Sequence, residues 1–164
     1  MNPEPWLRGT LKGTNPFIAP ILYSFQMARE DLARFTEGLT DEQAWARPIG
    51  LAPVGFQIRH TGGSVERLIA YAEGKALTVA QLDALKHEFD PGEPLKDLLL
   101  KLDETLRNAE VAIEAIDPET FAEPRTVGRK ALPTSVIGLL IHAAEHTQRH
   151  VGQAIVTAKI VSQR

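Results

Sequence analysis

Apolar residues recur at helical spacing in four long stretches of the chain. In the first stretch Ile18, Leu22, Phe25, Leu32 and Phe35 share one face, as the core side of an amphipathic helix does. The third has the most regular pattern, with apolar residues close to a heptad repeat. The four predicted helices are residues 16–37, 53–73, 94–116 and 133–161. They are long enough to form the body of the protein.

Helix signals also mark the segments between these stretches. Thr40–Gln43 and Thr78–Gln81 each have the form of a capping box, which predicts two short helices in the connectors. Asn15 and Pro16 are suited to open the first long helix, while Pro20 indicates that its regular part begins one turn later. Only residues 125–132 resemble a strand. We therefore predict a single all-α domain, residues 1–164, that forms a four-helix bundle with short helical turns in its connectors.

Composition narrows the possible functions. The 164 residues are 43% hydrophobic, which suits one domain with a substantial core. The net charge of −3 argues against nucleic acid as a partner. No uncharged apolar run approaches the roughly 18 residues of a membrane span, and the N-terminus lacks a secretory pattern. We expect a cytoplasmic protein without a membrane partner.

The chain has no cysteine, so histidines and carboxylates are its only strong metal ligands. Three of its five histidines, His142, His146 and His150, repeat every four residues in the last helix. Histidines four apart lie roughly 6 Å from each other on one helical face, so two can bind the same ion. Histidines eight apart are about 12 Å apart, so the three cannot share one ion. The pair is either His142 with His146 or His146 with His150.

A third ligand must come from another part of the fold. The candidates are His60 in the second long helix and His87 in a connector, and His60 is preferred because a long bundle helix holds a ligand in place. Three neutral imidazoles around a divalent ion leave one position open for water or substrate. Zinc suits this ligation best, although nickel, iron, cobalt and copper also accept it.

The histidine repeat has a plainer interpretation. On a helical projection its line lies about 110° from the apolar centre, so it is equally consistent with a solvated face. Glu66 and Glu145 are candidates to orient ligand histidines or to act as a base, and Arg67 and Arg149 to meet an anionic substrate. Charged residues on a helix are, however, most often simply solvated.

Two segments resemble the DinB/YfiT-like superfamily of metal-binding four-helix bundles. They are Gly55-Phe-Gln-Ile-Arg-His-Thr-Gly-Gly-Ser-Val-Glu-Arg-Leu68 and His142-Ala-Ala-Glu-His-Thr-Gln-Arg-His-Val-Gly-Gln153. The resemblance implies that His60, His146 and His150 are the metal ligands and that His142 is a neighbour one turn earlier. It also implies a homodimer and a zinc or nickel ion. Many members have arginine after the last histidine, where this chain has Val151.

Some members of this superfamily transfer low-molecular-weight thiols such as bacillithiol or mycothiol, or isomerise maleylpyruvate with a thiol cofactor. The leading hypothesis is therefore a metal-dependent transferase or hydrolase acting on a small molecule, with a thiol as possible cosubstrate. A metal-bound thiol loses its proton near neutral pH, so the substrate can supply the sulfur that the chain lacks. The alternatives are a noncatalytic dimeric stress-response or interaction protein whose metal is structural or vestigial, and a bundle without metal.

Overall fold

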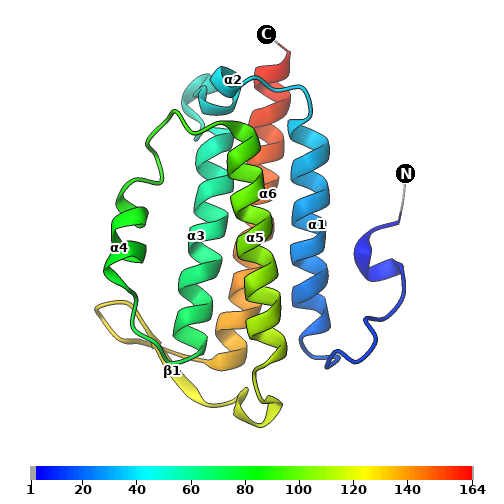
Figure 1. Cartoon of the computed structure of the whole chain (residues 1–164), viewed down its shortest axis with the longest axis vertical. Helices are drawn as coiled ribbons and strands as arrows, with labels where there is room; N and C mark the ends of the chain where they lie inside the picture. Colours follow the sequence, from blue (N-terminus) through cyan, green and yellow to red (C-terminus); the bar gives the residue numbers. More distant parts are fainter. Residues whose placement is uncertain (1–2, 164) are drawn as a thin grey trace.

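The computed structural model describes residues 3–163, and residues 1, 2 and 164 lie outside that range. Four long helices lie side by side as a bundle (Figure 1). They are α1 (Ala19–Thr36), α3 (Val54–Ala72), α5 (Leu95–Glu114) and α6 (Val136–Ser162). Shorter elements are α2 (Asp41–Trp45), α4 (Val79–Lys86) and 3₁₀ turns at Pro5–Leu7, Pro48–Gly50 and Pro118–Thr120. The prediction of an all-α four-helix bundle is confirmed.

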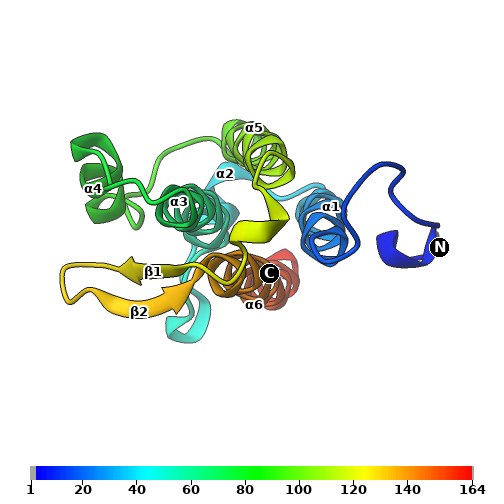
Figure 2. The ribbon, with the colours of Figure 1, turned by 90° about the horizontal axis from the view of Figure 1, so that it is seen from below.

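The directions of the helices could not be predicted from the connectors. In Figure 1, α1 and α6 run one way and α3 and α5 run the other. Parallel neighbours need a connection that returns along the whole bundle, and residues 73–94 form this crossover. The crossover contains α4, which lies outside the bundle beside α3 (Figure 2).

The core runs through the middle of the bundle. Phe25, Ile58, Leu106 and Leu140, one from each long helix, are at most 1% exposed. Burying a side chain of this size contributes about 1.5–3 kcal/mol relative to leaving it in water. Helix α6 packs most extensively against α1 and α3, and α3 also packs against α5. None of the helices in residues 3–163 combines the length and apolarity of a membrane-spanning segment.

The helix ends follow local sequence signals. Both capping boxes are present. The side chains of Thr40 and Thr78 each accept a hydrogen bond from the backbone N–H three residues later, and Oε1 of the glutamine at that position accepts one from the backbone N–H of the threonine. Helix α1 begins at Ala19, next to Pro20, so its regular part starts late as expected. Gly74 has φ +72°, a left-handed conformation that glycine adopts readily, and it follows the end of α3.

A small β-hairpin corrects the predicted start of the last helix. Strands β1 (Pro124–Val127) and β2 (Leu132–Ser135) pair antiparallel, with Thr126 opposite Pro133. The stretch of residues 125–132 that resembles a strand in the sequence covers most of β1 and the first residue of β2. The last helix does not start at residue 133. It begins at Val136, because residues 132–135 are extended and the Ser135 hydroxyl accepts a hydrogen bond from the Gly138 N–H.

Gly55, at the start of α3, lies against the ring of Trp45. A Cβ at this position would be 2.7 Å from Cε2 of that ring. The ring cannot move easily, because its Nε1 donates to the Glu93 carbonyl at 2.8 Å and the Arg59 guanidinium lies 4.7 Å from the ring centre.

Gly55→Ala is expected to lower the free energy of unfolding by about 1–3 kcal/mol, which is the usual cost of overpacking. Urea unfolding followed by circular dichroism measures it. Gly152→Ala is the control, because nothing lies within 4 Å of a Cβ there. Equal stability of the two variants would contradict the prediction.

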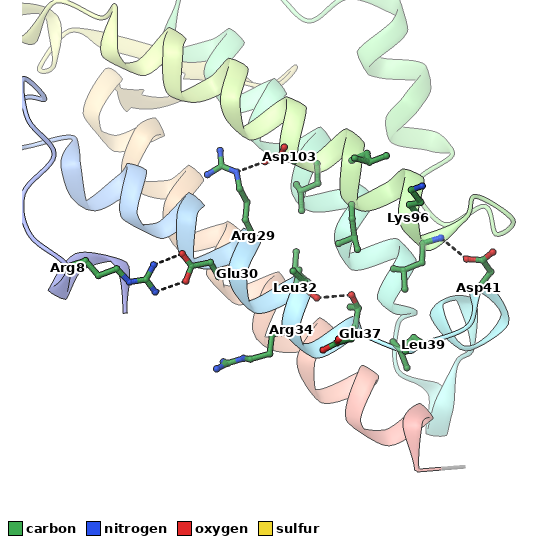
Figure 3. Close-up of a pocket in the computed structure, with 17 residues that line it drawn as sticks. Arg8, Arg29, Glu30, Leu32, Arg34, Glu37, Leu39, Asp41, Lys96 and Asp103 are labelled. Carbon is green, nitrogen blue, oxygen red and sulfur yellow. Dashed lines mark hydrogen bonds and ion pairs between the residues drawn. The ribbon is translucent and has the colours of Figure 1, made fainter. Parts of the chain in front are cut away.

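A cavity of about 1100 Å³ lies between α1 and α5. Its lining mixes leucine side chains with ion pairs, among them Arg8 with Glu30 and Arg29 with Asp103 (Figure 3). No histidine of the chain lines this cavity. The chemistry that the sequence suggests therefore lies elsewhere in the bundle.

Candidate metal centre

The structure brings three histidines together where α3 packs against α6. His60 comes from α3, and His146 and His150 lie one turn apart on α6. Each offers one ring nitrogen to a common site, and these three atoms lie within 4.8 Å of one another. The ring centres of His60 and His150 are 4.4 Å apart, as are those of His146 and His150. All three side chains are partly buried.

Burial keeps two of these histidines neutral. Burial, and after it the nearby His60, lowers the pKa of His146 and of His150 to about 4. Their imidazoles therefore carry no charge at neutral pH and retain a lone pair. A neutral imidazole is the form that binds a metal ion.

Polar neighbours orient two of the rings. Nδ1 of His60 is 2.6 Å from Oε2 of Glu88, and Nδ1 of His150 is 2.6 Å from Oε1 of Gln57. A carboxylate or an amide carbonyl can only accept, so in both rings Nδ1 donates its hydrogen. Nε2 is then the nitrogen with the free lone pair. Both rings are thus held in the tautomer that leaves Nε2 available.

Aromatic side chains support His60 from one side. Phe56, one turn earlier on α3, stacks on the His60 ring with centres 5.2 Å apart, and Phe89 stacks on Phe56 at 3.6 Å. Arg59 donates from Nη1 to the carbonyl oxygens of His87 at 2.9 Å and of Asp90 at 2.6 Å. The end of the α4 connector is in this way fastened to α3 beside the histidines.

The other two histidines lie outside the cluster. His142 is exposed on α6, and its Nδ1 is 3.4 Å from Oε2 of Glu145. His87 is also exposed, with its Nδ1 2.7 Å from Oδ2 of Asp90. Of the two pairs considered on α6, the structure therefore groups His146 with His150, and it groups them with His60 rather than with His87.

The four charged residues considered as candidates in the sequence each have another partner. Glu145 is exposed and pairs with Arg149. Glu66 accepts a hydrogen bond from Gln81 of the neighbouring helix α4. Arg67 is buried and donates to Glu88 at 2.8 Å. Both arginines are therefore already paired with carboxylates.

Two residues next to the histidines were missed by the sequence reasoning. Gln57 lies three residues before His60, and a polar residue on the apolar stripe of α3 was a weak signal for it. Glu88 lies in a connector, where no spacing rule relates it to a helix. Only the path of the crossover brings it to His60.

The donor set fits a divalent first-row ion. Nitrogens that bind zinc tetrahedrally at about 2.0–2.1 Å lie roughly 3.3 Å from one another. Small side-chain rotations can bring atoms within 4.8 Å of each other to that spacing. Hydrogen bonds to the second nitrogen of ligand histidines are a regular feature of metal sites, and His60 and His150 have them.

Comparison with known proteins agrees with the fold. A solved structure, described as the conserved protein of a locus from Enterococcus faecalis, superimposes with a TM-score of 0.67 at 16% identity, covering 88% of this chain and 96% of that one. None of the curated proteins matches the chain. A family model for the DinB superfamily matches residues 24–154, a span that includes the three clustered histidines. Most of the bundle thus falls within one family match, and the chain belongs to the DinB superfamily.

Proposed function

We propose that the protein binds a divalent metal ion, with zinc as the first candidate, through His60, His146 and His150 and acts as a metal-dependent transferase or hydrolase on a small molecule. The observation that carries this proposal is the convergence of three ligand atoms within 4.8 Å from two packed helices. When bound, such an ion polarises a thiol or a water at its open position and lowers the pKa of that group.

The chain contributes binding and orientation to this chemistry. His146 and His150 stay neutral at neutral pH, so they neither repel a cation nor need to release a proton to bind it. Glu88 and Gln57 keep Nε2 of His60 and His150 free. All three protein ligands are neutral histidines, so they leave the positive charge of the ion uncompensated. This favours an anionic fourth ligand such as a thiolate.

Partial exposure of the three rings favours a site that a small molecule can enter. A purely structural zinc site is usually closed by four protein ligands. Among residues 3–163, no fourth histidine or carboxylate joins the cluster of His60, His146 and His150. This supports the catalytic interpretation over the structural one.

The test uses untagged protein loaded with zinc. It is assayed with cysteine and glutathione as thiols and 1-chloro-2,4-dinitrobenzene as acceptor, so that a C–S bond forms, the C–Cl bond breaks, and chloride and a proton leave. Hydrolysis of 4-nitrophenyl acetate tests water as the nucleophile. We expect zinc-dependent turnover that is lost in His150→Ala and retained in His142→Ala.

Two outcomes would overturn the enzyme proposal. One is stoichiometric zinc binding without turnover in either assay, which would favour the noncatalytic dimeric protein with a structural metal. The other is turnover that persists unchanged in His150→Ala. Failure of the wild-type protein to bind zinc would remove the metal site as well.

A further inference from the structure

Glu88 is a buried carboxylate in the crossover between α4 and α5. Its exposure is only 4%, whereas α4 itself has no buried side chain. Burying a carboxylate is costly unless charged or hydrogen-bonding partners compensate for the lost water. The partners of Glu88 should therefore explain why its carboxylate is buried.

Each oxygen of Glu88 has one partner on α3. Oε2 lies 2.6 Å from Nδ1 of His60, and Oε1 accepts from Nη1 of Arg67 at 2.8 Å. His60 and Arg67 are two helical turns apart, so they lie on the same face of α3 and the carboxylate bridges them. The Arg67 side chain is only 10% exposed, so the ion pair is shielded from water.

Gly63 provides the space for this arrangement. A Cβ at residue 63 would lie 2.8 Å from Nη1 of Arg67 and 2.8 Å from Oε1 of Glu88. At Gly62 the nearest atom to a Cβ would be Cδ1 of Leu102 at 3.6 Å, an ordinary contact. Of the two adjacent glycines, only Gly63 lies directly against the Arg67–Glu88 ion pair.

We propose that Glu88 is a positioning residue of the metal centre. Arg67 holds the carboxylate in place, and Gly63 leaves room for the two side chains. Its carboxylate keeps the hydrogen of His60 on Nδ1 and directs Nε2 toward the ion. A carboxylate behind a ligand histidine fixes the tautomer of the ring and increases its basicity. This inference rests on the proposed metal binding by His60, His146 and His150.

The same contact joins the centre to the crossover. Glu88 is followed by Phe89, which stacks on Phe56, and the segment is clamped by Arg59. If Glu88 strengthens the binding of an ion through His60, the ion must strengthen the docking of this segment by the same free energy. Zinc is therefore expected to slow hydrogen exchange of the backbone amides in residues 79–90 of the wild-type protein.

Glu88→Gln is the primary test. Arg67 only donates, so the amide oxygen of the glutamine should face it and the amide nitrogen should face Nδ1 of His60. That nitrogen cannot accept the His60 hydrogen, which then moves to Nε2 and competes with the ion. Zinc affinity, measured by competition with a chromophoric chelator, is expected to fall about 10- to 100-fold, as for other residues behind a metal ligand.

The two glycines supply a matched pair of variants. Gly63→Ala should weaken zinc binding in the same direction as Glu88→Gln, while Gly62→Ala should bind zinc like the wild type. Either alanine gains up to about 1 kcal/mol in helix propensity, so a fall in affinity at residue 63 would not be a simple loss of helix stability. Thermal unfolding of the metal-free variants measures whether either alanine lowers the stability of the protein.

A double-mutant cycle separates positioning from general structure. In a His60→Ala background, Glu88→Gln should cause no further loss of the residual zinc affinity, and zinc should no longer slow exchange in residues 79–90. An additive loss, or wild-type affinity in Glu88→Gln, would overturn the inference while leaving the metal site intact. Absence of zinc binding in the wild type and in Gly62→Ala would instead refute the proposed function on which the inference rests.

Discussion

His146→Ala is expected to reduce the zinc content of the purified protein from about one ion per chain to a small fraction, because it removes one of three converging ligands. The fall in affinity should exceed the roughly 10- to 100-fold range of residues that lie behind a ligand. Elemental analysis of untagged protein and calorimetric titration measure these quantities.

His142→Ala is the matched control for this variant. His142 lies on the same helix, one turn before His146, and its ring centre is only 5.4 Å from that of His146. It is nevertheless exposed and outside the cluster, so its replacement should leave the zinc content unchanged. Equal loss of zinc in both variants, or in neither, would contradict the assignment of the ligands.

Zinc is expected to remain bound as the pH falls from 8 to 6 and to be released below about pH 5, when protons begin to compete for the imidazoles. The pKa of His146 and of His150 is lowered to about 4, chiefly by burial and also by the nearby His60. Solvated histidines titrate near pH 6.5, so a solvated metal site would release its ion over that higher range. Equilibrium dialysis across the pH range distinguishes the two. Half-release at pH 6.5 or above would contradict the burial argument.

The same pKa values set the pH dependence of stability without metal. His146 and His150 have a pKa of about 4 when folded and about 6.5 when unfolded, so the unfolded chain binds more protons between these values. Their contribution to the free energy of unfolding is therefore present above pH 6.5 and lost as the pH falls toward 4. Urea unfolding of the metal-free protein should show this loss, and a His146→Gln, His150→Gln double variant should show less of it.

Local sequence signals predicted much of the fold. The helical spacing of apolar residues located the four long helices, because burying one face of a helix requires that spacing whatever the helix packs against. The threonine and glutamine pairs at residues 40–43 and 78–81 predicted both short helices, because a capping box satisfies backbone groups within one turn. The hairpin was only partly predicted, through the strand-like residues 125–132, because the pairing of residues 124–127 with 132–135 depends on two short segments that carry weak signals individually.

The sequence by itself determined the helices, the short capped turns and the set of histidines from which a metal site can be built, because each of these follows from spacing within one segment. Only the tertiary structure decided that α3 and α5 run in the same direction, so that the connector of residues 73–94 must return along the bundle. That return places Glu88 against His60, while the packing of α3 on α6 places Gln57 against His150. Contacts between distant segments depend on the path of the chain, and no periodicity within a segment encodes that path.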